Sequence, residues 1–248
     1  MDQNESGESQ KEQKMLVPGA IILAGAIVAG AIIYVNSPRN QGGNTVLPPN
    51  GQEQLAGTGG AVPPLTDEAA KALKIRQNDF VLGNPAAKVV IIEYGDFQCP
   101  FCGRFFKTTE QQIISEYVKT GKAAFLWRDF AFLGEESFRA SEAARCAGEQ
   151  GKFWEYHDHI FNNQKGENEG AFGDPVLKRF AKDLSLDTTK FDLCFTSGKY
   201  RKDVEASAAE GRMIGVNGTP ATFVNTKLIS GAVPFETFKN VIEEELKK

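Results

Sequence analysis

The sequence predicts an α/β domain with a helical insertion, preceded by an apolar membrane-spanning helix and a flexible linker. Three observations lead to this fold class: a strand–helix–strand pattern from Lys88 to Phe130, helical segments from about residue 135 to 214, and two strands with a final helix after them. The 248 residues suffice for one large domain or two small ones. The formal net charge of −4, from 28 basic and 32 acidic side chains, gives no electrostatic footprint for nucleic acid, which is not an expected partner.

The N-terminal region is expected to anchor the chain in a membrane. Residues 1–14 are polar and charged, and Met15–Val35 then runs for 21 residues without a charge. A helix needs about 20 apolar residues to cross a bilayer. A cleaved signal peptide is the alternative, because the segment contains many small residues, but the apolar region of a signal peptide is usually only about 7 to 15 residues long.

Basic residues indicate how this segment is oriented. Lys11 and Lys14 precede it and Arg39 follows it. Since basic residues favour the cytoplasmic side, we expect residues 1–14 to be a cytoplasmic tail and residues 15–35 to be the transmembrane anchor. The rest of the chain then lies outside the cytoplasm, in a periplasm or at the cell surface, where disulfides persist. The even number of cysteines, 4, agrees with that location.

Residues 36–64 are predicted to form a flexible linker. This segment is rich in Gly, Pro, Asn and Gln and has almost no large apolar residues. Such a sequence cannot bury enough apolar surface to offset the entropy cost of ordering it. The folded domain is therefore expected to span residues 65–248.

The first half of the domain is predicted to contain a short helix and a parallel strand–helix–strand unit. Thr66–Ile75 has the pattern of a capped helix, and Lys88–Phe97 is almost continuously apolar, as in a central strand buried on both faces. Cys99–Lys119 has helical spacing, and Gly121 follows as a stop signal. Ala123–Phe130 is the second strand, which should be parallel to the first.

The second half is predicted to be helical and then to return to strands. Four candidate helices lie in the insertion, at residues 136–151, 152–163, 174–186 and 199–215. Thr219–Asn225 and Thr226–Gly231 are predicted as a β-hairpin, and Pro234–Lys248 as an amphipathic helix.

Cys99 and Cys102 form a C-x-x-C pair at the start of the predicted helix. Pro100 fits the first helical turn, where its missing N–H costs nothing. Residues three apart face the same side of a helix, so the two sulfurs come within disulfide range. Cys99 should have a depressed pKa, because the unpaired N–H groups and the positive dipole end of the helix favour a thiolate. We therefore expect Cys99 to exchange with a substrate and Cys102, one turn further in, to resolve the mixed disulfide.

Two other interpretations of the cysteine pair are weaker. A zinc site would need His157 and His159 as its remaining ligands, but their H-x-H spacing on a helix points them to different sides, so no metal is predicted. A purely structural bridge with so short a loop would remove little entropy from the unfolded chain. Redox exchange is the interpretation that uses the helix end, the proline and the preceding buried strand together.

At these residues the chain resembles the disulfide-forming DsbA-like branch of the thioredoxin superfamily, over about residues 80 to 246. Three segments carry the resemblance: VVIIEYGDFQCPFC, GVNGTPATFV at residues 215–224, and GKFWEYHDHIF, which is similar to a core helix of the family's helical domain. The resemblance implies a thioredoxin fold with an inserted helical domain and no cofactor.

The resemblance also implies roles for three residues outside the cysteine pair. Thr219 and Pro220 match the family's cis-proline loop, where the Thr219 backbone would lie beside Cys99 and pair with an unfolded substrate as an added strand. Glu93, six positions before Cys99, matches the family's buried acid. In a dry site its pKa should rise, so that it exchanges a proton with Cys102. An ordinary, hydrogen-bonded carboxylate at a strand end is the alternative for Glu93.

Two further features of the sequence can be compared with members of this family: the residue between the cysteines and the second cysteine pair. Strongly oxidising members carry His between the cysteines where this chain has Phe101, so we expect a less oxidising couple. Some relatives contain a structural disulfide in the helical domain, which implies a bridge between Cys146 and Cys194. Such a bridge would close a loop of about 49 residues and stabilise the fold by roughly 4 kcal/mol on the chain-entropy model, with two buried free thiols as the alternative.

The remaining aromatic residues and the two histidines are expected in the core, in a surface patch or without a catalytic role. The core should contain Phe153, Trp154, Tyr156 and Phe161. An apolar patch for unfolded substrates should border the active site, formed by Phe97, Phe101 and Phe132. His157 and His159 are expected to have no catalytic part.

The sequence therefore predicts a membrane-anchored protein disulfide oxidoreductase that introduces disulfides into exported proteins. Expected partners are unfolded or newly exported proteins with cysteines and, as the resemblance implies, a quinone-linked membrane oxidoreductase that reoxidises the pair. A disulfide reductase or isomerase on the same fold is one alternative, although the linker has no room for the dimerisation domain of a family isomerase. A tethered peptide-binding or chaperone module with structural cysteines is the other.

Overall fold

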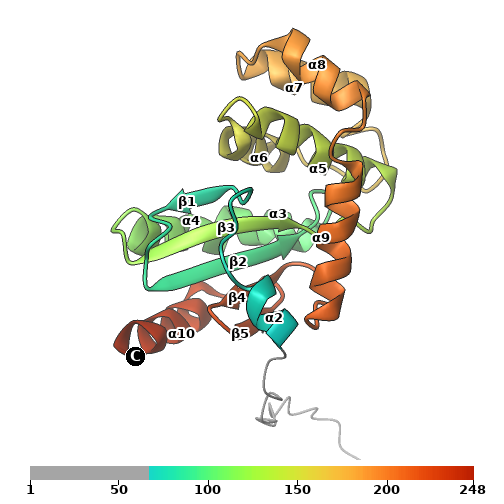
Figure 1. The fold of residues 1–248 in the computed structure, drawn as a ribbon. Helices are drawn as coiled ribbons and strands as arrows, with labels where there is room; N and C mark the ends of the chain where they lie inside the picture. The colour runs from blue at the N-terminus through green and yellow to red at the C-terminus, as the bar shows by residue number, and fades with distance from the viewer. Residues whose placement is uncertain (1–66) are drawn as a thin grey trace, which may run out of the picture. The chain divides into compact units, whose positions relative to one another are not determined.

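The computed structural model describes residues 67–248, which contain a five-stranded mixed sheet with strand order β1-β3-β2-β4-β5 (Figure 1). The strands are β1 (Val81–Gly83), β2 (Val89–Gly95), β3 (Ala123–Asp129), β4 (Ala221–Val224) and β5 (Lys227–Ser230). The predicted tail, anchor and linker at residues 1–14, 15–35 and 36–64 lie outside the described residues. Within residues 67–248, no helix combines the length and the apolar character needed to cross a membrane.

The central strands β2 and β3 pair in parallel, as the sequence predicted. Every residue of β3 is buried, and only Val90 of β2 is partly exposed. β4 pairs antiparallel with the other edge of β2 and continues into β5 as the predicted hairpin. The short strand β1, which adds antiparallel to β3, was not predicted, because three residues give no measurable periodicity.

The two faces of the sheet are covered by different helices. On one face, α10 (Phe235–Lys247) and the helix that follows β2 pack against Ile91, Phe125 and Val224. On the other face, α2 (Asp67–Ala72) and α9 (Arg201–Met213) lie near Ile92, Leu126 and Phe223. The sheet is therefore buried on both sides, which explains why its central strands are almost continuously apolar.

The helix after β2 begins and ends close to its predicted bounds but is not a uniform α-helix. It consists of α3 (Pro100–Phe105), the π-helical turn η1 (Phe106–Glu110), α4 (Gln111–Ile113) and the π-helical turn η2 (Ile114–Val118). π-Helical turns inside α-helices occur frequently at functional sites. Helical spacing in the sequence does not distinguish them from regular turns.

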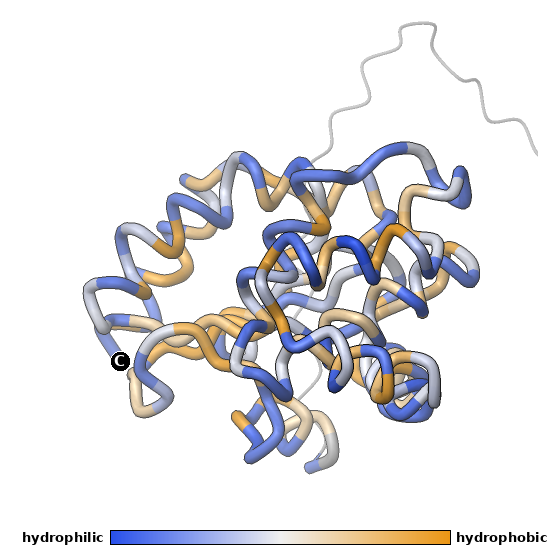
Figure 2. The backbone as a smooth tube through the Cα atoms, turned by 90° about the horizontal axis from the view of Figure 1, so that it is seen from above, coloured by the Kyte–Doolittle hydropathy of each residue, from blue (hydrophilic) through white to orange (hydrophobic). Residues whose placement is uncertain are grey.

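The insertion between β3 and β4 contains five helices rather than the predicted four. They are α5 (Glu135–Gly148), α6 (Phe153–Asn162), α7 (Asp174–Asp183), α8 (Thr188–Thr196) and α9. The N-cap residue of the unpredicted α8 is Asp187, whose carboxylate accepts hydrogen bonds from the backbone N–H groups of Thr189 and Lys190. Along the helices the residues alternate between hydrophilic and hydrophobic (Figure 2), as expected for helices with one buried and one solvated face.

Candidate active site

Cys99 and Cys102 lie at the start of α3, just beyond the end of β2. Cys99 is the N-cap residue, with extended backbone angles (φ −65°, ψ 120°), and Pro100 is the first helical residue. Both cysteines are free thiols; Cys102 is fully buried and Cys99 is 5% exposed. The sulfur of Cys99 therefore lies at the edge of the surface, and the sulfur of Cys102 is buried behind it.

The pKa of Cys99 is lowered from 9.0 to about 6. The largest cause is a hydrogen bond from the Cys102 thiol, with Thr219 and the backbone N–H groups of Cys102 and Phe101 adding to it against the effect of burial. These N–H groups belong to the first turn of α3, whose donors have no partner within the helix. At neutral pH Cys99 is therefore largely a thiolate, the form that attacks disulfides.

Cys102 has the opposite protonation behaviour. Burial raises the pKa of Cys102 well above its usual range, and the hydrogen bond to Cys99 and the negative charges of Glu93 and Cys99 raise it further. Cys102 thus keeps its proton under conditions where Cys99 has lost its own. This asymmetry suits a pair in which one sulfur exchanges with substrate and the other resolves the mixed disulfide.

The loop before β4 lies directly against Cys99. The peptide bond between Thr219 and Pro220 is cis, and Cys99 Sγ lies 3.4 Å from the Thr219 carbonyl oxygen, to which the thiol donates a hydrogen bond when it is protonated. Pro220 is buried and Thr219 is partly exposed. The Thr219 carbonyl group therefore lies next to the sulfur, in a residue that is partly exposed.

Glu93 lies on β2, opposite Trp127 of β3 and Thr222 of β4. It is 1% exposed, and neither of its carboxyl oxygens has a hydrogen-bond partner among the described residues. Burial, and secondly the negative charge of Cys99, raise the pKa of Glu93 well above its usual range. The side chain is thus not the ordinary hydrogen-bonded carboxylate that the sequence left open.

Glu110 is a second buried acid, and sequence reasoning missed it. It lies in η1, is fully buried, and neither carboxyl oxygen has a hydrogen-bond partner in the described part of the chain. Burial raises the pKa of Glu110 well above its usual range, and the charges of Glu93 and Asp158 raise it further. A signal was present, because Glu110 lies four residues after Phe106 and three before Ile113, on the apolar face of the predicted helix.

Glu110, His157 and Asp158 form the one cluster of potential metal ligands found among residues 67–248. Each offers a ligand atom, and these atoms lie within 4.8 Å of one another. The residue types are ones that bind zinc, but the cluster does not include the cysteine pair. The zinc interpretation of Cys99 and Cys102 gains nothing from it.

His157 is fully buried on α6, and burial lowers its pKa. Its Nδ1 lies 3.0 Å from Oδ1 of Asp158, a side chain that is 50% exposed. Its ring contacts six aromatic rings, those of Phe97, Phe106, Trp127, Phe153, Trp154 and Phe161. By contrast His159 is partly exposed, with Nε2 3.9 Å from Asp183 Oδ2.

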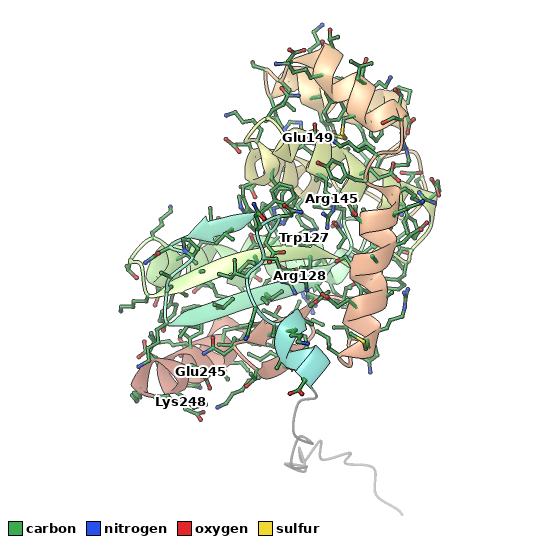
Figure 3. The ribbon with its side chains drawn as sticks, in the orientation of Figure 1. Trp127, Arg128, Arg145, Glu149, Glu245 and Lys248 are labelled. Carbon is green, nitrogen blue, oxygen red and sulfur yellow. A yellow bond between two sulfur atoms is a disulfide. The ribbon has the colours of Figure 1, made fainter. Side chains whose placement is uncertain are left out.

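Residues of the helical insertion hold the loop that carries Cys99. The Gln164 side-chain amide donates to the carbonyl oxygens of Phe97 and Cys99, at 2.8 and 2.9 Å. The Asp96 carboxylate accepts from the Ser137 hydroxyl at 2.6 Å, and also from backbone N–H groups after β3. Trp127, labelled in Figure 3, belongs to the core cluster that joins the end of β3 to the insertion. The insertion therefore fixes the position of Cys99.

The predicted apolar patch needs one correction. Phe101 and Phe132 are 52% and 45% exposed, but Phe97 is fully buried. Phe97 stacks on Trp127 with ring centroids 4.6 Å apart and so belongs to the core that supports the cysteine pair. Of the three predicted residues, Phe101 and Phe132 are therefore exposed and Phe97 is not.

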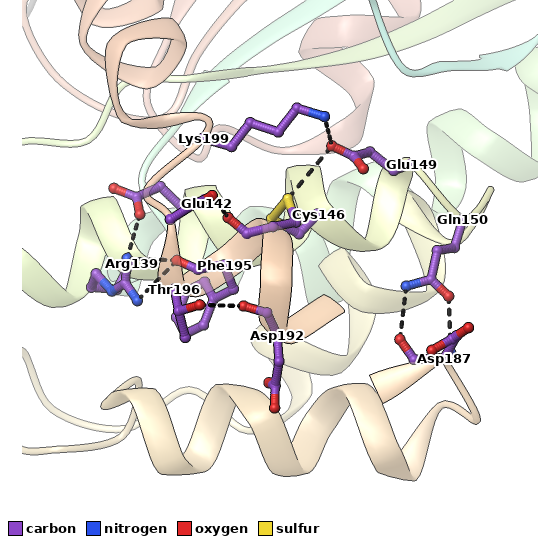
Figure 4. Close-up of a disulfide and its surroundings, with 12 residues drawn as sticks. Arg139, Glu142, Cys146, Glu149, Gln150, Asp187, Asp192, Phe195, Thr196 and Lys199 are labelled. Atoms are coloured by element: carbon purple, nitrogen blue, oxygen red, sulfur yellow. Dashed lines mark hydrogen bonds and ion pairs between the residues drawn. A yellow bond between two sulfur atoms is a disulfide. The ribbon is translucent and has the colours of Figure 1, made fainter. Parts of the chain in front are cut away.

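Cys146 and Cys194 form a disulfide that joins α5 to α8 (Figure 4). Both are buried, and the sulfurs lie beside Glu149, which also pairs with Lys199. Phe153, Tyr156 and Phe161 belong to the same core cluster of the insertion, and Trp154 packs against it.

Comparisons with known proteins agree with this geometry. The family model described as Thioredoxin matches residues 76–244. The chain belongs to the thioredoxin family. The probable disulfide bond formation protein D of Bacillus cereus is 29% identical to it over 171 residues, which are 67% of this chain and 78% of that protein. These matches identify a DsbA-like thiol–disulfide oxidoreductase of the thioredoxin family.

Solved structures share the fold. The oxidised crystal structure of BdbD from Bacillus subtilis has a TM-score of 0.65 at 24% identity and covers 69% of this chain and 94% of its own. The structure of alpha-DsbA1 from Wolbachia pipientis has a TM-score of 0.65 at 22% identity and covers 72% of this chain and 96% of its own. The sheet with its inserted helices is thus a thioredoxin-like α/β fold, as the sequence predicted.

Proposed function

We propose that this chain introduces disulfides into exported proteins, as a membrane-anchored oxidoreductase that works outside the cytoplasm through the Cys99–Cys102 pair. The observation that carries the proposal is the contrast between the two sulfurs. The pKa of Cys99 is lowered to about 6, while burial raises that of Cys102 well above its usual range. A thiolate held beside a protonated resolving thiol stabilises the reduced pair, which makes the disulfide of that pair an oxidant.

The proposed reaction transfers two electrons from substrate to enzyme. A substrate thiolate attacks Cys99 Sγ of the disulfide, the bond between Cys99 and Cys102 breaks, and Cys102 leaves with the electron pair and takes up a proton. A second substrate thiolate then attacks the substrate sulfur of the mixed disulfide, and Cys99 leaves as a thiolate. The substrate dithiol has become a disulfide, and the enzyme disulfide a dithiol.

Two features of the domain suit an unfolded substrate. The Thr219 backbone lies next to the sulfur and can pair with an extended chain as an added strand. Phe101 and Phe132 are exposed apolar side chains that can contact hydrophobic residues of such a chain. Main-chain pairing and apolar contact are largely independent of substrate sequence, as a protein that acts on many exported polypeptides requires.

The proposal includes the predicted organisation of the whole chain. Residues 1–14 are a cytoplasmic tail, residues 15–35 a transmembrane anchor and residues 36–64 a flexible linker, and the DsbA-like thioredoxin domain spans residues 65–248 with its helical insertion at about residues 135–214. The support is the uncharged run of 21 residues and the basic residues before it. A quinone-linked membrane oxidoreductase would accept the electrons from the reduced pair and restore the disulfide.

Trapping of mixed disulfides tests the exchange chemistry. In Cys102→Ala the mixed disulfide at Cys99 cannot be resolved, so we expect covalent complexes with exported proteins on non-reducing gels that disappear with reductant. Cys99→Ala is the matched control and should trap none. Absence of complexes from Cys102→Ala would favour the alternative of a tethered peptide-binding or chaperone module.

A further inference from the structure

Two packed helices bring three potential metal ligands together. Phe106 of the helix after β2 stacks on Phe161 of α6, with ring centroids 5.2 Å apart. Glu110 is the last residue of the π-helical turn η1, and His157 and Asp158 are consecutive residues of α6. Each of the three offers one ligand atom, and these atoms lie within 4.8 Å of one another. The three side chains therefore converge where the helix after β2 contacts the helical insertion.

We propose that Glu110, His157 and Asp158 bind a divalent transition-metal ion of the zinc type, which joins the helix after β2 to the insertion. Cys99 and Cys102 are not ligands of this site. The inference goes beyond the proposed function, because metal binding at these residues requires no thiol–disulfide exchange.

Glu110 differs from most other buried acids in having no partner. It is fully buried, and neither carboxyl oxygen has a hydrogen-bond partner among residues 67–248. Four of the six buried carboxyl side chains in this range have hydrogen-bond or ion-pair partners: Asp96, Asp129, Glu142 and Glu245. Glu93 is the other exception, but it does not belong to the ligand cluster. Buried polar groups in native proteins nearly always have a partner, and a bound ion is one way to supply it.

The charges around Glu110 favour a cation. After burial, the negative charges of Glu93 and Asp158 raise the pKa of Glu110. Like charges close together cannot all ionise readily, so the metal-free protein keeps Glu110 protonated. A divalent ion would replace that proton and neutralise the carboxylates of Glu110 and Asp158.

The spacing of His157 and Asp158 suits two ligands of one ion. His157 Nδ1 lies 3.0 Å from Asp158 Oδ1. Ligand atoms of four-coordinate zinc lie about 3.3 Å apart, because zinc–ligand bonds are about 2.0–2.1 Å long. The carboxyl group of Glu110 is within 4.8 Å of the other two ligand atoms, a span that rotation about its broad terminal torsion can shorten. A small side-chain movement thus places all three ligands on one ion.

The types of ligand indicate which metal binds. One imidazole nitrogen and two carboxylate oxygens suit zinc and similar transition metals, whereas calcium and magnesium prefer oxygen ligands alone. Three protein ligands leave a fourth position for water. The Asp158 side chain is 50% exposed, so the ion can enter the site from solvent at this ligand.

Calorimetric titration with zinc chloride tests the site in the oxidised full chain. The protein is purified without a histidine tag and dialysed first against a chelator and then against buffer. In this form all 4 cysteines are in disulfides and do not bind zinc. The variants are Glu110→Gln and Asp158→Asn. Asp183→Asn is the matched control, because Asp183 is a half-exposed aspartate beside His159, the second of the 2 histidines in the chain.

One zinc ion per chain should bind to the wild type and to Asp183→Asn. Binding should be at least tenfold weaker in Glu110→Gln and in Asp158→Asn, since even changes to groups that only orient metal ligands cost about 10- to 100-fold in affinity. Calcium chloride at the same concentrations should not bind at this site. Zinc should also raise the melting temperature of the wild type and the control more than that of the two variants, because a ligand of the folded state stabilises it.

Absence of stoichiometric zinc binding by the wild type overturns the site, as does wild-type affinity in both Glu110→Gln and Asp158→Asn. An equal loss in Asp183→Asn would reveal a general charge effect and overturn it too, and calcium binding as tight as zinc binding would contradict the assignment to a transition metal. If Glu110→Gln does not fold, Asp158→Asn at the surface decides the matter alone. Failure of the proposed function would show instead in the trapping experiment, because the zinc titration involves no exchange at Cys99.

Discussion

Glu110 and Glu142 are both buried glutamates, yet their surroundings are opposite. Glu142 pairs with Arg139 and Arg201, while Glu110 has no partner among the described residues. A buried carboxylate with cationic partners stabilises the fold through them, whereas an unpartnered one is stable only when protonated. The two residues therefore predict opposite effects of the same substitution.

Glu110→Gln should raise the free energy of unfolding at pH 8. The folded-state pKa of Glu110 lies above the unfolded value of about 4.5, so its stabilising contribution is fully present below pH 4.5 and is lost as pH rises toward the folded pKa. Glutamine removes this loss, so the variant should exceed wild type by about 1 kcal/mol or more at pH 8 and match it near pH 4. Urea unfolding of the oxidised, metal-free protein, whose cysteines do not titrate, measures the difference.

Glu142→Gln is the control and should destabilise the protein by about 2 kcal/mol at pH 8, because hydrogen bonds to charged groups are lost. If Glu110→Gln lowers stability at pH 8 as Glu142→Gln does, Glu110 has a partner and is not held protonated.

At the residue scale the sequence predicted the cysteine pair, Glu93 and the Thr219–Pro220 loop, because short motifs mark them. It missed Glu110, His157 and Asp158 as a group. Their proximity arises from packing of α6 against the helix after β2, and residue spacing within either helix carries no information about that contact.

At the scale of elements, the helical insertion supports the active site rather than forming a separate unit. Gln164 and Ser137 hold the backbone around Cys99, and Trp127 and Phe97 join the core cluster of the insertion. The Cys146–Cys194 disulfide joins α5 to α8 and makes no contact with the cysteine pair among these interactions. Its effect on the site is therefore only indirect, through the stability of the insertion.

Removal of that disulfide should lower stability and spare catalysis. Cys146→Ala combined with Cys194→Ala opens a loop with a sequence separation of 48, and loss of a native disulfide costs about 2–5 kcal/mol. We expect that decrease in urea unfolding, with the rate of dithiol oxidation by Cys99–Cys102 unchanged at 25 °C. A rate that falls with the stability would show that the insertion positions Cys99 through this bridge.

The sequence predicted most elements because strong periodicity marks them, and it failed where periodicity is short or altered. The parallel strands β2 and β3 were predicted from continuous apolar runs. α8 was missed because its first turn contains Thr188 and Thr189, which favour helices weakly, although Asp187 is a typical N-cap. The π-helical turns depend on tertiary packing and have no signal in residue spacing.

At the scale of the whole molecule, the thioredoxin-like sheet brings together segments that lie far apart in the sequence. β2 ends at Gly95, shortly before Cys99, and β4 starts directly after Pro220; the antiparallel pairing of these strands puts Thr219 beside the sulfur. The proximity of Thr219 and Cys99 was predicted only through the family resemblance, because local sequence patterns do not encode which strands are neighbours in a sheet.

The central claim is that the pair is an oxidant because the Cys99 thiolate is stabilised. Among related couples, a nucleophile pKa of about 7 accompanies a reduction potential of about −270 mV in thioredoxin, and about 3.5 accompanies about −120 mV in DsbA. The pKa of Cys99, at about 6, lies between these values. Phe101 in place of the histidine of strongly oxidising members agrees with an intermediate couple.

Equilibration of the Cys99–Cys102 pair with glutathione at pH 7, quantified by trapping free thiols, gives its reduction potential. We predict a value between about −270 and −120 mV, the range bounded by thioredoxin and DsbA. A value at or below that of thioredoxin would contradict the account and assign the chain to disulfide reduction.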